Sequence, residues 1–370
     1  RGEGVWVWDV EGNKYMDFLS SYSALNFGHC HPEIIEVLTR QAGRLTLTSK
    51  AFFNDKLTEL YTILEQVTNK QMFLPMNTGA EAVETSIKAA RRWGYEIKGI
   101  PEHQAEIIVC QNNFHGRTIT VISFSSEPAY RKNFGPHTPG FVIIPYNDIE
   151  ALKEAITPYT CGFLVEPIQG EGGVIVPDQD YLEKARLLCD EHNVLLIGEE
   201  IQTGLGRTGK LFGSDWFGVV PDIYILGKAL GGGVYPISMV AADSSILDVF
   251  TPGSHGSTFG GNPLGSAVAC QALTILRRDS LDERALKMGE YLMSKINGLN
   301  HHPDVVEIRG RGLMIGIELR HPARTYAEKL MRMGMLCKET HGTVLRLAPP
   351  LIITEQEIDF AVEKLLALFD

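Results

Sequence analysis

Residues 223–233 read IYILGKALGGG, and the interpretation of the whole chain starts from this stretch. Four consecutive apolar residues, 223–226, are typical of a strand covered on both faces. Similar short apolar runs occur upstream and alternate with stretches of helical spacing. The runs are Ile107–Cys110, Phe141–Ile144, Phe163–Val165 and Val194–Ile197, and the helical stretches are Leu57–Val67, Glu81–Trp93 and Tyr181–His192. This alternation predicts an α/β fold with a largely parallel, doubly wound sheet.

The two ends of the chain have a different pattern. Val5–Val10 and Tyr15–Leu19 flank a turn at 11–13 and predict a hairpin. After residue 264, a smaller α+β domain is predicted from Ser266–Arg278, Asp282–Leu299, Val305–Leu319, Tyr326–Met333 and Glu355–Phe369. We therefore expect an N-terminal hairpin segment (1–31), a large domain (32–264) and a small C-terminal domain (265–370).

The last helix has the clearest local signals. Thr354 and Glu357 form a capping-box pattern at its start. One apolar stripe is predicted from Ile358, Ala361, Val362, Leu365, Leu366 and Phe369.

Composition excludes several classes of protein. Of 370 residues, 44% are hydrophobic and 21% charged, as in ordinary globular proteins, and the formal net charge is −11. Such an acidic chain with no basic patch argues against nucleic-acid binding, and no apolar run reaches the ~18 residues of a membrane span. The six cysteines are scattered without CxxC spacing, which indicates reduced thiols in the cytoplasm. Because the chain begins at Arg1 rather than Met, we expect a preceding segment; a transit peptide there would indicate the mitochondrial matrix instead.

Polar residues follow three of the apolar runs. Glu166 comes after 163–165, Glu199 and Glu200 come after 194–197, and Lys228 comes after 223–226. Ligands of doubly wound sheets bind beyond the carboxyl ends of the strands, so we expect these side chains to share one edge. Between an apolar strand and a glycine run, a partly desolvated lysine would be a nucleophile suited to Schiff-base chemistry. A lysine that merely marks the end of a strand is the alternative.

Two further segments resemble ligand-binding turns. Asn77–Ala80 joins a strand, Met72–Met76, to a helix, and the amides of such a helix N-terminus can hold a phosphate. In Asn113–Thr118, Phe114 could stack on a flat ring while Arg117 holds a carboxylate. An ordinary turn, a core phenylalanine and a surface arginine remain the alternatives.

Two motifs carry less weight. Gly204–Gly209 matches GxGxxG, but it does not follow its strand directly, and Leu211 replaces the hydroxyl residue that a P-loop needs. His29–His31 lacks a partner cluster for a metal, so we interpret it as structural and predict no metal site.

Taken together in this order and spacing, the segments resemble the class III, fold type I, pyridoxal-phosphate aminotransferases over essentially the whole chain. The motifs are 20–24, 29–32, 77–84, 113–118, 165–173, 200–209, 226–233, 255–265 and 346–351. The resemblance implies the fold of aspartate aminotransferase, pyridoxal 5'-phosphate as cofactor, and a homodimer with active sites shared across the interface.

The resemblance also assigns the residues that would hold the cofactor. Lys228 would bind it covalently and shuttle the proton, and Glu199 would face the ring nitrogen. The other contacts would be Gly79 and Ala80 to the phosphate, Ser257 and Thr258 to the phosphate of the neighbouring subunit, Phe114 and Ile201 to the two ring faces, and Gln202 to the ring hydroxyl.

Four residues would bind substrates. Arg117 would hold a substrate carboxylate and Tyr22 would line the pocket. Glu171 would pair with Arg346 while a basic substrate is bound, and would release it for the second carboxylate of 2-oxoglutarate.

The sequence departs from the family pattern at Glu199, where an aspartate is usual. The charge is kept and one methylene is added, so we expect activity to be retained, at a lower rate if the ring cannot adjust.

The resemblance is greatest to members that act on ornithine. It implies transfer of the δ-amino group of L-ornithine to 2-oxoglutarate, giving glutamate and glutamate 5-semialdehyde, which cyclises to pyrroline-5-carboxylate, a step of arginine and proline metabolism. N-acetylornithine or 4-aminobutyrate remain alternative amine donors. Two alternatives come from other classes. A nucleotide-binding dehydrogenase or P-loop protein is supported by residues 204–210 alone. A binding protein without catalytic activity is suggested by the unusual Glu199.

Overall fold

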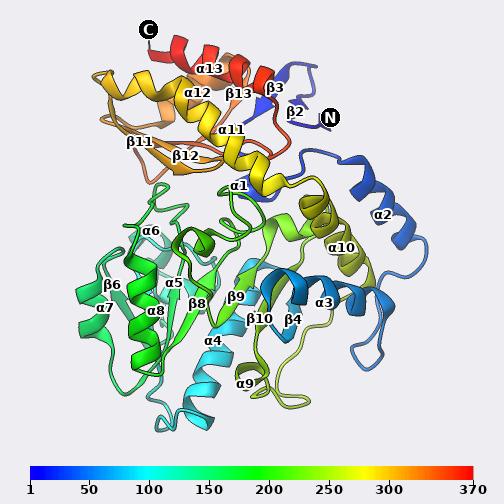
Figure 1. Ribbon diagram of the computed structural model, residues 1–370, viewed down its shortest axis with the longest axis vertical. Helices are drawn as coiled ribbons and strands as arrows, with labels where there is room; N and C mark the ends of the chain where they lie inside the picture. The colour runs from blue at the N-terminus through cyan, green and yellow to red at the C-terminus, as the bar shows by residue number, and fades with distance from the viewer. Residues whose placement is uncertain (370) are drawn as a thin grey trace.

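The computed structural model describes residues 1–369. Its elements form a large part around a central sheet and a smaller part rich in the C-terminal elements (Figure 1). The first strands of the chain, blue in Figure 1, lie beside the smaller part. The N-terminal hairpin therefore packs with residues that are more than 300 positions away in sequence.

The central sheet has seven strands in the order β4-β10-β9-β8-β7-β5-β6. Strands β5 to β9 pair in parallel, whereas β10 is antiparallel to β4 and to β9. The bounds are β4 Met72–Met76, β5 Glu106–Cys110, β6 Phe141–Ile144, β7 Thr160–Val165, β8 Leu195–Glu199, β9 Ile223–Leu226 and β10 Ser238–Ala242. The prediction of a mostly parallel, doubly wound sheet is confirmed.

Both faces of this sheet are buried, which explains the continuous apolar runs. Ile107 and Val109 of β5 pack in one apolar cluster with α4 (Gly79–Glu96), whereas Ile108 and Cys110 pack in another with α8 (Tyr181–Glu191). The remaining helices of this part are α1 Ser20–Ser23, α2 Pro32–Ala42, α3 Asp55–Thr68, α5 Ile119–Ser123, α6 Pro128–Arg131, α7 Ile149–Ala155 and α9 Ser244–Leu247, with 3₁₀ turns η1 Gly213–Phe217 and η2 Lys228–Gly231.

The smaller part contains an antiparallel sheet in the order β11-β12-β15-β14. Its elements are α11 Leu281–Ile296, η3 Asn297–His301, β11 Val305–Arg311, β12 Met314–Leu319, α12 Arg324–Arg332, β13 Met335–Leu336, β14 Lys338–Thr340, β15 Val344–Leu347 and α13 Glu355–Phe369. The connecting helix α10 (Pro263–Arg278) packs against α2 and α3. Since α10 begins at Pro263, the predicted boundary at 264/265 falls in its first turn. The three-segment division stays a prediction.

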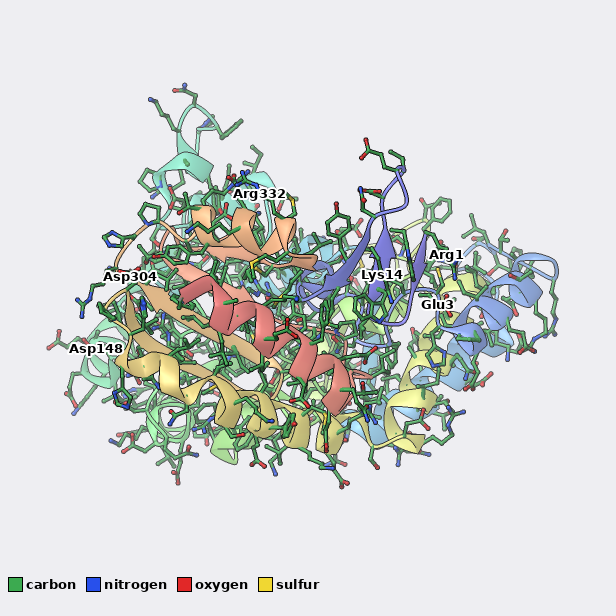
Figure 2. All side chains as sticks on the ribbon, turned by 90° about the horizontal axis from the view of Figure 1, so that it is seen from above. Arg1, Glu3, Lys14, Asp148, Asp304 and Arg332 are labelled. Carbon is green, nitrogen blue, oxygen red and sulfur yellow. The ribbon has the colours of Figure 1, made fainter. Side chains whose placement is uncertain are left out.

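A second small sheet explains why the hairpin joins the C-terminal elements. It has the order β1-β2-β3-β13, with β1 Gly2–Glu3, β2 Trp6–Trp8 and β3 Lys14–Asp17. The last strand, β13, pairs in parallel with β3. Figure 2 shows Arg1, Glu3 and Lys14 close together on these first strands. The predicted hairpin is confirmed, with shorter strands than expected.

One local prediction needs correction, two are confirmed, and one strand was not predicted. Leu366 is 40% exposed and Leu368 is buried in its place, so the apolar stripe of α13 was wrong at that position. The strand-like segment 305–319 is confirmed; it forms two antiparallel strands, β11 and β12, joined by a turn at Gly312 and Leu313. Strand β10 (Ser238–Ala242), which consists of a serine, a methionine, a valine and two alanines, was not predicted. The capping box of α13 is confirmed, since Glu357 N donates to Thr354 Oγ1 at 3.3 Å and Thr354 N donates to Glu357 Oε2 at 2.9 Å.

The GxGxxG segment has a structural role at the junction of the two parts. Arg207 is buried and donates to Asn26 Oδ1 at 2.6 Å, to the Leu313 carbonyl oxygen at 2.9 Å and to the Pro349 carbonyl oxygen at 2.6 Å. A charged group with three such bonds fixes the parts relative to one another. Within residues 1–369, no helix combines the length and apolar character that crossing a membrane requires.

Candidate active site

The carboxyl ends of three neighbouring strands bring together the groups predicted from the sequence. Glu166 follows β7, Glu199 ends β8, and Lys228 follows β9 by two residues. Burial raises the pKa of Glu199 to about 8, although the Lys228 charge opposes this, and burial lowers the pKa of Lys228 to about 8, against the charge of Glu199. The pKa of Glu166 is raised well above its usual value by burial and by Glu199. The predicted cluster at the sheet edge is therefore present.

Glu200 lies outside this cluster, contrary to the expectation from its position after the strand. Its carboxylate accepts hydrogen bonds from the Thr203 hydroxyl, from Gly213 N at 2.8 Å, and from the backbone and hydroxyl of Ser214 at 2.8 Å. Successive side chains of a strand point to opposite faces, so one glutamate faces the site and the next one supports η1.

The polar environment of Glu199 fits a bound cationic ring. Among residues 1–369, no side chain hydrogen-bonds to this buried carboxylate, and its nearest basic neighbour is His115, whose Nδ1 lies 4.0 Å away. Burial lowers the pKa of His115 to about 3, and neither ring nitrogen of His115 has a hydrogen-bond partner among the described residues. A buried carboxylate needs a partner, and a protonated pyridine nitrogen would supply one.

Two glycines, Gly79 and Gly227, pack closely against the Ile201 side chain. A Cβ atom on Gly79 would lie 2.9 Å from Ile201 Cδ1, and one on Gly227 would lie 3.4 Å from Ile201 Cγ2. Gly79 therefore admits no side chain without displacing the isoleucine. Phe114 is fixed through its backbone, since its N–H donates to Glu166 Oε2 at 3.2 Å. That the two residues cover opposite faces of one ring stays a prediction.

The start of α4 is arranged as an anion site requires. Glu81 N donates to Thr78 Oγ1 at 3.3 Å, and Glu81 Oε2 accepts from the N–H groups of Asn77 and Thr78 at 2.9 and 2.8 Å. This capping box uses neither the Gly79 nor the Ala80 N–H, so both groups are available to an anion at the positive end of the helix.

The loop that carries Ser257 and Thr258 lies beside the same helix start. Ser257 Oγ accepts from Asn77 Nδ2 at 3.0 Å, and the Thr258 side chain is exposed. Their predicted contact with the neighbouring subunit's cofactor stays a prediction.

Arg346 and Glu171 are paired, as predicted. Arg346 Nη1 donates to Glu171 Oε1 at 2.6 Å, and only 1% of Arg346 is exposed. Burial alone would raise the pKa of Glu171, but the charges of Arg346 and Lys228 outweigh it and lower the pKa. The Gln202 amide joins the pair, since its oxygen accepts from Arg346 and its Nε2 donates to Glu171 at 3.3 Å. In this structure Gln202 therefore supports the ion pair.

Tyr22, in the short element α1, and Arg117, in the segment before α5, each contact other predicted site residues. The Tyr22 hydroxyl accepts from Lys338 Nζ at 2.9 Å, and Arg346 Cζ lies 5.4 Å from the centre of its ring. Arg117 is exposed and its Cζ lies 4.2 Å from the Tyr130 ring centre. Among the described residues no carboxylate pairs with Arg117, so its guanidinium is available to a substrate.

Lys338 was not predicted as a site residue. It lines a cavity of about 560 Å³ together with Phe114, Tyr130 and Glu171. Strand pairing places it directly opposite Arg346, and this pairing cannot be read from sequence spacing alone. His115 lies within the predicted motif 113–118, where the sequence assigns it no role, and only its burial beside Glu199 distinguishes it.

The His29–His31 segment lies away from these groups. His29 Nε2 lies 2.8 Å from Asp17 Oδ2, and Cys30 is exposed. The contact joins the segment to the N-terminal sheet.

Comparisons with known proteins agree with this geometry. The family model of class-III aminotransferases matches residues 1–369. The chain is 62% identical over 365 residues to an ornithine aminotransferase of Brevibacillus brevis, covering 99% of this chain and 91% of that protein. It is 58% identical to the ornithine aminotransferase of Bacillus subtilis, covering 98% and 90%.

Solved structures give the same result. The ornithine aminotransferase of Toxoplasma gondii, reported with partial occupancy of PLP at the active site, superposes with a TM-score of 0.98 at 47% identity, covering 100% of this chain and 88% of that one. An acetylornithine aminotransferase from Elizabethkingia anophelis superposes with a TM-score of 0.90 at 48% identity, covering 100% and 92%.

Proposed function

The chain belongs to the class-III aminotransferase family, and from this premise we propose how its site works. It is a pyridoxal-phosphate-dependent enzyme of fold type I that transfers the δ-amino group of L-ornithine to 2-oxoglutarate. The products are glutamate and glutamate 5-semialdehyde, which cyclises to pyrroline-5-carboxylate. The observation that supports this substrate pair best is the buried Arg346–Glu171 ion pair beside Tyr22.

The ion pair explains how one site can accept a basic and an acidic substrate. While Glu171 holds Arg346, the site presents no free cation at this position to repel the second amino group of ornithine. When Glu171 releases it, the guanidinium can bind the distal carboxylate of 2-oxoglutarate through two parallel hydrogen bonds. Arg117, whose guanidinium pairs with no carboxylate among residues 1–369, would hold the other substrate carboxylate.

Pyridoxal phosphate, when bound, supplies the covalent attachment and the electron sink for the reacting carbon. Gly79 and Ala80 would hold its phosphate, and Glu199 would keep its ring nitrogen protonated. Lys228 Nζ would carry the cofactor until the substrate amine displaces it, and the freed amine would then accept the proton from the substrate carbon that bears the amino group. A lysine whose pKa is lowered to about 8 is neutral often enough near pH 8 to act as this base.

We also propose that the enzyme is a homodimer and acts in the cytoplasm. Phe53 is fully exposed and Phe52 and Phe259 are 69% and 50% exposed. The first two line an apolar cavity of about 330 Å³ with Pro75. Exposed aromatic side chains around a cavity are typical of a surface that another chain covers, and Thr258 lies next to Phe259.

The rival functions have less support. Residues 204–209 pack at the junction of the two parts through Arg207, which leaves a dinucleotide-binding reading without support. A silent binding protein would not need Lys228 and Glu199 to be buried together.

We expect ornithine to be preferred over N-acetylornithine and 4-aminobutyrate by at least about 10² in kcat/KM with 2-oxoglutarate as acceptor. N-acetylation removes a charged amino group, and 4-aminobutyrate lacks the α-amino group and is one carbon shorter between its carboxylate and its reacting amine. Pyrroline-5-carboxylate and glutamate formation are to be measured. Equal or faster turnover of either rival donor would contradict the substrate assignment.

Replacing Arg346 by methionine should lower kcat/KM for 2-oxoglutarate by about 10²–10³, because a bidentate contact to a carboxylate is lost. The ornithine half-reaction should fall by less than about tenfold. Each half-reaction is to be followed separately with stopped-flow absorbance. Arg332→Met, on the exposed side of α12 (Figure 2), serves as control and should change neither. Equal losses in both half-reactions of Arg346→Met would refute the alternating role.

A further inference from the structure

A loop over residues 251–261 carries Ser257 and Thr258 and is attached to α4 at two places. Near the start of the helix, Ser257 Oγ accepts hydrogen bonds from Asn77 Nδ2 and from Gly260 N, both at 3.0 Å. About two turns further along α4, the His255 ring contacts the helix. Thr258, which directly follows Ser257, remains exposed.

The contacts of His255 determine its protonation state. The Thr85 hydroxyl donates its proton to the Glu81 carbonyl oxygen at 2.7 Å, so it can only accept from His255 Nε2 at 3.1 Å. The Lys88 ammonium has donors alone, so His255 Nδ1 must accept from it at 2.9 Å. The imidazole is therefore neutral with its proton on Nε2, and it stacks on Phe250 with ring centres 4.7 Å apart.

The charges around the ring favour this neutral state. Burial lowers the pKa of His255, and the positive charges of Lys88 and Lys50 lower it further. Among residues 1–369 no carboxylate pairs with the ring. A neutral histidine can thus use both nitrogens at once, one as donor and one as acceptor.

We propose that His255 is a positioning residue that fixes the loop 251–261 on α4, so that Thr258 is held ready for the cofactor phosphate of a second copy of this chain. The inference deepens the proposed function, since it rests on a dimer whose loop serves the neighbouring site. Helix α4 also begins with Gly79 and Ala80. One rigid helix would therefore position the phosphate-binding groups of both subunits.

The test uses the purified enzyme with His255→Phe, which keeps the ring stacking and removes both hydrogen bonds. Cleavage of the loop by a protease at low concentration should become about tenfold faster, and the dissociation constant of pyridoxal 5'-phosphate should rise about tenfold. Lys88→Met, a substitution of an exposed residue, should raise the cleavage rate and the dissociation constant by a smaller factor. The double variant should resemble His255→Phe, because the two changes remove a shared bond.

Thr258→Ala separates this inference from the function on which it rests. It should weaken cofactor binding without changing loop cleavage. Unchanged cofactor binding in Thr258→Ala would overturn the role of the loop in the neighbouring site. Unchanged loop cleavage in Lys88→Met and His255→Phe, or additive effects in the double variant, would overturn the positioning role of His255. If His255→Phe does not fold, the Lys88→Met result alone decides.

Discussion

Replacing Lys228 with alanine is expected to lower transamination turnover by at least about 10³-fold. The variant loses both the amine that binds the cofactor covalently and the base that moves the proton. No neighbour can replace it, because the closest charged groups are the carboxylates Glu199, Glu166 and Glu171 and the guanidinium of Arg346. Turnover is to be measured with saturating ornithine, 2-oxoglutarate and pyridoxal 5'-phosphate.

Lys210→Ala is the matched control for this prediction. Lys210 is also a glycine-flanked lysine, but it is exposed and its Nζ lies 5.6 Å from the Trp216 ring centre. The control should keep full activity. After borohydride reduction, mass spectrometry should find a pyridoxyl adduct on Lys228 in the wild type and in the control. An adduct on another lysine, or substantial turnover in Lys228→Ala, would refute the assignment.

The backbone rule for doubly wound sheets accounts for what could be predicted of the site. Apolar runs marked the parallel strands, and the residues that follow them, Glu166, Glu199 and Lys228, meet at one edge. The rule predicts where the strands end, but it does not predict the direction in which each side chain points. Glu200 therefore could not be separated from Glu199 until the strand's alternation was seen.

Residues brought in by distant pairing could not be predicted without a relative. Lys338 faces the site because β14 pairs with β15, and Tyr22 does so from a turn in which Ser20 to Ser23 all have positive φ. Non-glycine residues rarely adopt that conformation, and no local signal in the sequence demands it here. Similarly, the pairing of β13 with β3 joins segments over 300 residues apart. Tyr22, Glu171 and Arg346 were predicted as site residues from the resemblance to the family, and residue spacing alone does not indicate them.

Replacing Glu199 with glutamine is expected to lower kcat by about 10²–10³ while the cofactor still binds. Glutamine keeps the size of the side chain but cannot stabilise a protonated ring nitrogen by charge. The buried position makes that charge effective, because water does not screen it. The visible spectrum of the bound cofactor, titrated with pH, should show the ring nitrogen losing its proton at lower pH than in the wild type.

Glu199→Asp restores the residue usual in the family and shortens the side chain by one methylene. We expect its kcat to equal or exceed that of the wild type by a small factor, since charge is kept and the surrounding strand β8 need not move.

Glu200→Gln is the control, because it changes the neighbouring buried glutamate that lies outside the site. That carboxylate accepts bonds from Gly213 and Ser214, so its loss should lower stability by about 1–3 kcal/mol, measured by urea unfolding, with little change in the ring-nitrogen titration. If Glu199→Gln kept wild-type turnover, the ring nitrogen would have to be held by another group, and His115, 4.0 Å from Glu199, would be the nearest one.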